Sequence, residues 1–310
     1  MSPPVAVVSM SGGKDSVATA LVAIEQYGRD RVRIVHADTG NEHPLTERYV
    51  RDYLPSALGV PVEIVQADFT AEIARKRAYV LSHWPGKGVP DDVCRAALAV
   101  LVVTGNPFLD LCVMKGRFPS RMAQFCTQEL KGKPLDAYTM TLARLGPVES
   151  WQGVRRDESL NRRNALDWEQ ADQGWMIHRP IAAWSAADTF ALMAQHGITP
   201  NPLYSMGMKR VGCMPCINCG KDELLEIAQR WPDQIARIRR WEAMVAQVSK
   251  RGIASFFFML ATHGTAEEYA DANAIDQAVA WAATSHGGKQ FDLLRAIPSP
   301  ECSSAYGLCE

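Results

Sequence analysis

Residues 5–16 read VAVVSMSGGKDS and contain an apolar run, a Ser/Gly-rich loop and the beginning of a helical pattern. The run Val5 to Val8 is short and β-branched, which is typical of a buried strand. Beyond the loop, apolar residues recur at helical spacing as far as Gly28, which is placed to end that helix. The stretch therefore predicts a strand, a loop and a helix in that order, with the helix beginning near Ser16.

The loop between strand and helix has the chemistry of an anion cradle, although its spacing is neither that of a Walker A loop nor that of a dinucleotide fingerprint. Two adjacent glycines let backbone N–H groups turn toward one point, and the helix N-terminus and a lysine add positive charge. An ordinary Gly-Gly turn is the alternative. The residues predicted to hold phosphate are Ser9, Ser11, Gly12, Gly13, Lys14, Asp15 and Ser16.

Strand-like and helical segments alternate after this loop. Strands are expected at residues 33–37, 62–66, 148–154 and 176–181, with a helix over 45–58. Such alternation predicts an α/β fold, a doubly wound and mainly parallel sheet with ligands at the carboxyl ends of its strands.

The rest of the chain is expected to be mostly helical. Residues 70–145 have helical patterns broken by loops, and Ser185 with Asp188 predicts a capped helix start. From residue 221 onward the pattern is again helical. We therefore expect a nucleotide-binding α/β domain with a cysteine motif over residues 1–220, and a helical region with a cysteine-bearing tail over residues 221–310.

Composition and charge exclude several classes of protein. The 33 basic and 34 acidic residues give a net charge of -1, so any binding of nucleic acid must come from local patches. Two basic groups are candidates, although charged runs are usually solvated helix faces: Lys115, Arg117, Arg121, Lys131 and Lys133, and Arg237, Arg239 and Arg240. The longest apolar runs are shorter than the roughly 18 residues of a membrane span, and no secretory signal is evident. A cytoplasmic protein without a membrane partner is expected.

The eight cysteines are too few for a disulfide scaffold, so their clustering indicates metal binding or chemistry. Cys94 and Cys112 lie in apolar stretches and are predicted to be buried. The clustered cysteines are Cys126, then Cys213, Cys216 and Cys219, and finally Cys302 and Cys309.

Several motifs resemble known families. The SGGKDS sequence at residues 11–16 closely resembles the pyrophosphate loop of the PP-loop ATP pyrophosphatase superfamily. The GVRRDES sequence at 153–159, the stretch 179–184 and NPLY at 201–204 followed by Gly212-Cys213 resemble the phosphoadenosine phosphosulfate reductase family. That family includes sulfonucleotide reductases, the small ATP sulfurylase subunit and the sulfurtransferase of DNA phosphorothioation. The resemblance covers roughly residues 5–220 and implies an adenine-nucleotide hydrolase-like sheet.

The resemblance also implies roles for particular residues. The loop from Ser11 to Ser16 would hold the β- and γ-phosphates of ATP with Mg²⁺, with Lys14 and Asp15 acting in catalysis. Asp38 and Thr39 would lie beside the nucleotide. Gly153, Arg155 and Arg156 would complete the site, because arginine grips phosphate bidentately; a solvated surface pair is the alternative for the two arginines.

For the cysteines, the resemblance to adenylylsulfate reductases implies a [4Fe–4S] cluster. FCTQELKGKPL and GCMPC resemble the two halves of the cysteine motif that binds this cluster, but Phe125 stands where one cysteine of a pair is expected. The implied ligands are Cys126, Cys213 and Cys216, with Cys219, Cys302 or Cys309 as the fourth. A zinc site and free thiols are the alternatives.

The tail carries two further candidates for catalysis, Cys302 and Cys309. In the reductases of this family a mobile C-terminal cysteine attacks the sulfonyl sulfur, within a motif that is absent here. Catalytic use therefore stands beside a structural or ligand role.

An intact pyrophosphate loop indicates cleavage of ATP between its α- and β-phosphates. The sequence thus predicts an adenylylating sulfurtransferase, in which a cysteine persulfide or sulfide held on the cluster displaces AMP from an activated nucleic acid. DNA phosphorothioation and nucleobase thiolation are the concrete possibilities, with a cysteine desulfurase as sulfur donor. The alternatives are an adenylylsulfate or phosphoadenylylsulfate reductase, an ATP sulfurylase small subunit, and a nucleotide-sensing or nucleic-acid-binding module.

Overall fold

The computed structural model describes residues 4–249, 252–257, 274–285 and 290–291. Its main feature is a six-stranded sheet in the order β3-β2-β1-β4-β6-β5. All neighbouring strands are parallel except β5, which pairs antiparallel with β6. The strands are β1 (Val5–Ser9), β2 (Val32–Asp38), β3 (Val62–Gln66), β4 (Val148–Trp151), β5 (Trp168–Gln170) and β6 (Met176–His178).

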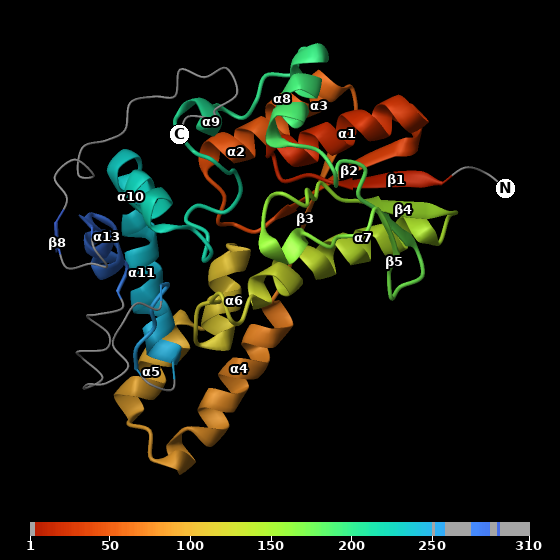
Figure 1. The fold of residues 1–310 in the computed structure, drawn as a ribbon. Coiled ribbons are helices and arrows are strands. Elements are labelled where there is room, and N and C mark those ends of the chain that lie inside the picture. The colour runs from red at the N-terminus through yellow and green to blue at the C-terminus, as the bar shows by residue number, and fades with distance from the viewer. Residues whose placement is uncertain (1–3, 250–251, 258–273, 286–289, 292–310) are drawn as a thin grey trace.

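Helices cover both faces of this sheet, as Figure 1 shows for α1 on one side and α7 on the other. Because strand side chains alternate between faces, Ala6 and Val8 pack toward α1 and α8, whereas Val7 packs toward α7. The predicted doubly wound α/β fold is therefore confirmed. The helices of this part are α1 (Lys14–Tyr27), α2 (Pro44–Arg48), α3 (Leu54–Leu58), α7 (Lys133–Ala143), α8 (Ala186–Gln195) and α9 (Pro202–Ser205).

Several predicted boundaries are corrected. Helix α1 begins at Lys14 rather than near Ser16, because Gly13 already has the extended conformation of an N-cap. Strands β4 and β6 are shorter than the expected 148–154 and 176–181. The helix expected over 45–58 is interrupted by a π-helical turn, Tyr49–Tyr53. The capped start of α8 is confirmed, because Ser185 and Asp188 form a reciprocal capping box.

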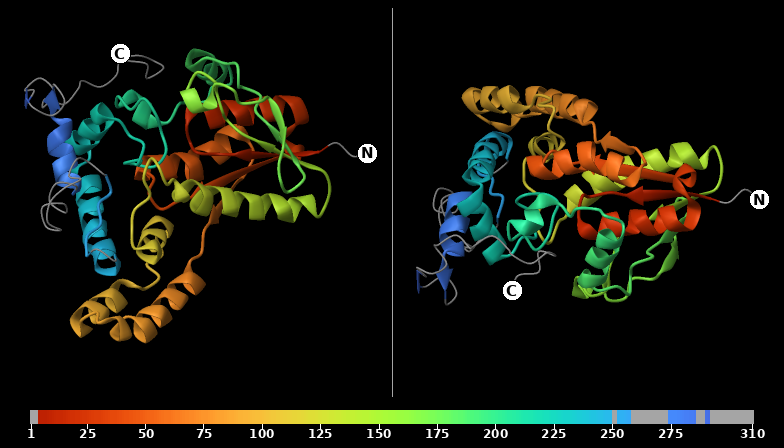
Figure 2. Two further views of the ribbon diagram at one scale, coloured as in Figure 1. Left: turned by 60° about the horizontal axis from the view of Figure 1, so that its bottom comes forward. Right: turned by 90° about the horizontal axis from the view of Figure 1, so that it is seen from above.

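The remaining helices gather at the end of the sheet away from the N-terminus (Figure 2). They are α4 (Thr70–His83), α5 (Asp91–Val100), α6 (Pro107–Lys115), α10 (Lys221–Arg230), α11 (Pro232–Val248) and α13 (Ile275–Ala282), followed by the short strands β7 (Thr284–Ser285) and β8 (Gln290–Phe291). No helix in the described ranges is both long enough and apolar enough to cross a bilayer.

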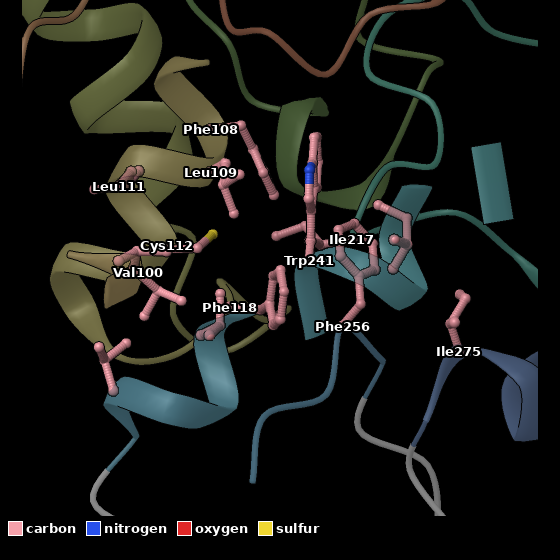
Figure 3. Packing of buried hydrophobic residues seen from close by; sticks show 14 of the residues in the cluster. Val100, Phe108, Leu109, Leu111, Cys112, Phe118, Ile217, Trp241, Phe256 and Ile275 are labelled. Atoms are coloured by element: carbon pink, nitrogen blue, oxygen red, sulfur yellow. The ribbon is translucent and has the colours of Figure 1, made fainter. Parts of the chain in front are cut away.

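These helices share one hydrophobic core, part of which Figure 3 shows. The Phe108 ring on α6 stacks on Trp241 of α11 at 5.6 Å between centroids, and Phe256 lies 5.9 Å from Phe108. Helices on the two sides of the predicted boundary at residue 220 therefore pack against each other. Cys94 and Cys112 are buried in this core, as predicted, with 8% and 0% of their surfaces exposed.

Candidate nucleotide and cysteine site

The glycine loop follows β1 and leads directly into α1, at the carboxyl end of the parallel strands. The Ser16 hydroxyl lies 3.2 Å from both the N–H and the hydroxyl of Ser11, and it donates to the Gly13 carbonyl at 2.9 Å. Gly12 has a φ of +76°, and a Cβ there would lie 2.8 Å from Val50 Cγ2, so this position requires glycine. The chain thus forms a closed turn at the positive end of α1.

Two residues from the distant NPLY segment hold this loop in place. The Lys14 N–H donates to the Tyr204 hydroxyl at 3.0 Å, and the Asn201 amide donates to the Gly12 carbonyl at 3.3 Å. Both side chains are almost fully buried. Tyr204 and Lys14 are 190 positions apart in the sequence. The distant NPLY segment therefore helps to fix the shape of the phosphate loop.

The turn after β4 packs against the N-terminus of α1. A Cβ on Gly153 would lie 2.8 Å from the carbonyl carbon and oxygen of Asp15, so only glycine fits between the two backbones. Arg155, which is 4% exposed, donates to Asp15 through Nε at 2.6 Å and forms an ion pair with Asp157. Arg155 therefore locks the glycine loop to the turn after β4.

The neighbouring Arg156 contacts a different part of the chain from Arg155. Its guanidinium donates to the Ala165 carbonyl and pairs with Asp167, in the excursion that leads to β5. Both arginines thus bind carboxylates in this structure, and the phosphate role of Gly153, Arg155 and Arg156 stays a prediction.

Strand β2 ends in two buried polar residues at the same edge of the sheet. Asp38 accepts from Gln66 at 2.9 Å and pairs with Arg51 at 2.5 Å. Thr39 donates its hydroxyl to Glu42 at 2.7 Å, and the same hydroxyl lies 3.5 Å from Cys213 Sγ. The end of β2 is therefore in contact with the cysteine loop.

The cysteine loop is fastened to this edge by further bonds. Asn41 donates to the Pro215 carbonyl at 2.9 Å, and Glu42 and Cys213 form an isolated antiparallel bridge. A Cβ on Gly13 would lie 3.7 Å from the Val211 carbonyl oxygen. The segment that carries Cys213 therefore runs directly beside the phosphate loop.

Lys131 interacts electrostatically with three of the predicted ligands. Cys213 is the chief cause of its raised pKa, and Glu42, Cys216 and Cys126 raise it further. Cys216 in turn raises the pKa of Cys126 and that of Cys213, so it interacts with each of these two thiols. Segments that are far apart in sequence thus meet at one cationic centre.

Burial raises the pKa of the Cys213 thiol to about 12, and Lys131 opposes this effect. A buried thiol of this kind stays protonated unless a metal or a strong cation stabilises its thiolate. The Asn218 N–H points at Cys216 Sγ at 3.4 Å and adds a further donor toward sulfur. A cation and an N–H directed at thiols are the surroundings that thiolate ligands require.

Among the described His, Cys, Asp and Glu side chains, no group of three is arranged to hold a metal ion. The [4Fe–4S] cluster and its zinc alternative both stay predictions. Cys219 adjoins Cys216, since its N–H donates to the Cys216 carbonyl at 2.9 Å.

One further cation lies against the same loop. Arg237 of α11 donates to the Met214 carbonyl at 2.8 Å and to the Asn41 side chain at 2.9 Å. Burial lowers its pKa, and its Nε is buried without a hydrogen-bond partner among the described residues. Arg237 therefore adds to the positive charge around Cys213.

Sequence reasoning missed several of these residues. Asn41, Glu42, Asn201 and Tyr204 were given no role, and Lys131 was placed only in a basic patch. Tyr204 and Asn201 lie in the NPLY motif, which was the available signal; nothing local marks Glu42. Cys302 and Cys309 lie outside the described residues, so their catalytic or ligand roles stay predictions.

Together these features define a doubly wound α/β protein with a glycine loop and a cysteine-bearing loop side by side at the carboxyl ends of its strands. Comparison with known proteins gives the same class. A model of the phosphoadenosine phosphosulfate reductase domain matches residues 5–219, and the chain belongs to that family.

Individual relatives differ in how much of the chain they match. An uncharacterized 37.8 kDa protein of Escherichia phage 186 is 46% identical over 98% of this chain and 96% of its own. The adenosine 5'-phosphosulfate reductase of Streptomyces coelicolor is 30% identical over 43% of this chain and 57% of its own. A solved phosphoadenylyl-sulfate reductase from Candida auris is 16% identical, with a TM-score of 0.44 over 69% of this chain and 84% of that one.

Proposed function

We propose that this protein is an ATP-dependent, adenylylating sulfurtransferase. The observation that carries the proposal is that the phosphate loop and the cysteine loop lie side by side. The phosphate loop is intact, and Thr39, at the same edge of the sheet, contacts Cys213 of the cysteine loop. A loop that holds pyrophosphate and a group of thiols within one site would serve activation of an acceptor followed by sulfur delivery.

In the first step, an acceptor oxygen would attack the α-phosphorus of Mg²⁺-bound ATP, and pyrophosphate would leave. The hydroxyls of Ser11 and Ser16, the Lys14 ammonium and N–H groups of the glycine loop would stabilise the charge on the departing pyrophosphate. Arg155 holds Asp15, and through it the start of α1, so the loop is already organised before ATP binds.

In the second step, a sulfur nucleophile would displace AMP from the activated acceptor. If the nucleophile is a cysteine persulfide, a second thiol then breaks its S–S bond; this releases the thiolated acceptor and leaves a disulfide that an external dithiol reduces. A [4Fe–4S] cluster, if bound by Cys126, Cys213 and Cys216, would supply sulfur-binding and electron-transfer chemistry here. Lys131 and the Asn218 N–H would stabilise the thiolates.

The test is a screen for pyrophosphate and AMP release from ATP by anaerobically purified protein. Sulfate, adenylylsulfate, DNA and tRNA are offered in turn as acceptors, together with a cysteine desulfurase and cysteine. Release of both products that depends on one acceptor, with sulfur recovered in that acceptor, supports the proposal. Absence of pyrophosphate release with every acceptor contradicts it.

A second candidate, reduction of adenylylsulfate or phosphoadenylylsulfate, is favoured by the similarity to curated adenosine 5'-phosphosulfate reductases. It predicts sulfite with AMP from adenylylsulfate, or sulfite with adenosine 3',5'-bisphosphate from phosphoadenylylsulfate, with reduced thioredoxin as the electron donor and no requirement for ATP. ATP-independent formation of sulfite would select this candidate over the first.

A further inference from the structure

A cavity of about 650 Å³ opens beside the last part of the cysteine loop, at Ile217, Cys219 and Gly220. Its walls come from the segment after α6, from the cysteine loop with the start of α10, and from the C-terminal helical region. The residues that matter for its chemistry are Arg121, Met122, Cys219, Lys221, Phe257 and Trp281.

The walls of this cavity are mainly apolar and partly aromatic. Phe257 and Trp281 are half-buried, and Phe257 packs edge-on against the buried Phe256 ring at 4.9 Å. Met122, at the mouth, is 97% exposed. A cavity of this size accommodates a planar group as large as a nucleobase, and a flat ring can stack on aromatic side chains whatever its hydrogen-bonding pattern.

Two cations lie at the same cavity. Arg121 donates through one Nη to the Cys219 carbonyl at 2.9 Å, and Lys221 sits over the Trp281 ring with its ammonium 4.6 Å from the centroid. The Lys221 ammonium also donates to the Thr284 carbonyl and, at 3.1 Å, to the Thr284 hydroxyl. Among the ion pairs of the described residues, none involves Arg121 or Lys221. The cavity thus pairs aromatic faces with positive charge, which complements a base joined to a phosphate.

Two further cations lie near Cys126. Lys115 and Arg117 lie 5.8 Å and 5.3 Å from the centroid of the Phe125 ring, directly before that cysteine, and Lys115 also pairs with Glu129 at 3.9 Å. A strand seated in the cavity would therefore meet further cations along its backbone. The net charge of the whole chain is -1, so this positive surface is a local feature.

We propose that this cavity is the base subsite for a single-stranded nucleic acid, which is the acceptor class of the sulfurtransferase. One unstacked base would stack against Trp281 and Phe257, its phosphate would contact Arg121 and Lys221, and the strand would run toward Cys126. This inference rests on the proposed function for its chemistry, but its binding step does not require ATP. Cys219 lines the cavity, and its backbone N–H donates to the Cys216 carbonyl. The seated base would therefore lie close to the loop that carries Cys213 and Cys216.

The experiment measures fluorescence anisotropy of labelled single-stranded RNA and DNA with the full chain, without ATP. Arg121→Ala and Trp281→Leu are each expected to weaken binding about fivefold or more, because one stacked base or one phosphate contact is lost. Arg144→Ala removes an exposed arginine at the end of α7 and is the matched control, expected to bind as the wild type does. Circular dichroism checks that Trp281→Leu is folded.

Unchanged affinity in both cavity variants, or an equal loss in Arg144→Ala, overturns the inference. So does displacement of the strand by free mononucleotide at the same molar concentration, because the cavity would then be a small-molecule site. Lys14→Ala separates the two proposals: it is expected to keep strand binding while losing pyrophosphate release. A failure of ATP chemistry alone therefore leaves the cavity assignment standing.

Discussion

The Thr39 hydroxyl lies 3.5 Å from the Cys213 sulfur, across 174 positions of sequence. Thr39 directly follows strand β2 beside the phosphate loop, and Cys213 begins the CxxC pair. Glu42 accepts a hydrogen bond from Thr39 and lies 3.8 Å from the same sulfur. The buried Thr39 and Glu42 therefore join the glycine-loop side of the molecule to the half-buried Cys213.

Lys14→Ala is expected to lower acceptor-dependent pyrophosphate release by about 10²–10³-fold, because a preorganised positive charge on the leaving group is lost. The folded state should survive, since the Lys14 ammonium has only weak described contacts: an ion pair with the adjacent Asp15 at 3.4 Å and a position 5.6 Å from the Tyr204 ring centroid. Pyrophosphate release under saturating ATP is the measurement. Lys87→Ala, an exposed lysine near α4, is the control; equal rates in both variants would contradict a role for Lys14.

Gly153→Ala is expected to destabilise the fold by ~1–3 kcal/mol, because the new methyl group must displace the backbone of Asp15. Urea unfolding measures the change. Gly146→Ala is a matched control, since a Cβ there meets nothing within 4 Å. If both variants unfold at the same urea concentration as the wild type, the close packing between the turn after β4 and α1 is wrong.

Serine substitutions of Cys126, Cys213 and Cys216 should each remove most of the bound iron. Anaerobically purified wild-type protein is expected to hold about four iron and four sulfide per chain. Cys94→Ala, in the hydrophobic core, should retain both. Iron and sulfide analysis of Cys219→Ser, Cys302→Ser and Cys309→Ser then identifies the fourth ligand as the variant that loses iron. One zinc per chain without sulfide would refute the cluster.

Stability is expected to fall between about pH 4.5 and 7 through one buried carboxyl. Burial raises the pKa of Glu242 from 4.5 to about 7, although its oxygens accept the Phe256 and Ile275 N–H groups. In this range the folded state holds more protons than the unfolded state, so raising the pH costs stability, by ~3 kcal/mol in total. The loss is complete above about pH 7.

Urea unfolding at several pH values, compared between the wild type and Glu242→Gln, measures this effect. The glutamine variant keeps an acceptor for the two N–H groups but has no proton to lose, so its stability should depend less on pH. Glu63→Gln, at an exposed position of β3, should retain the wild-type dependence. An identical pH profile in wild type and Glu242→Gln would show that Glu242 does not titrate in this range.

Local sequence is sufficient to predict the strand, loop and helix at residues 5–27 and the parallel sheet. The spacing of apolar residues, the positions of glycines and the helix-capping residues each report on structure within a few residues of themselves. The start of α1 was misplaced by two positions, since the N-cap is chosen by the conformation of Gly13 rather than by the apolar pattern. Strand β5 was missed because it is short, exposed and lacks apolar alternation.

The cysteine spacing indicates a shared centre, yet only the tertiary structure sets Lys131 within electrostatic reach of Cys126, Cys213 and Cys216. The same holds for Tyr204 on the phosphate loop and Glu42 beside the Cys213 thiol. These contacts join residues that are far apart in the sequence. They form only when the hydrophobic core packs the sheet edge, the cysteine loop and α11 together, so local sequence patterns do not predict them. The sequence shows which residue types could bind an anion or a metal. The fold decides which groups surround each of these side chains, and those surroundings set its pKa.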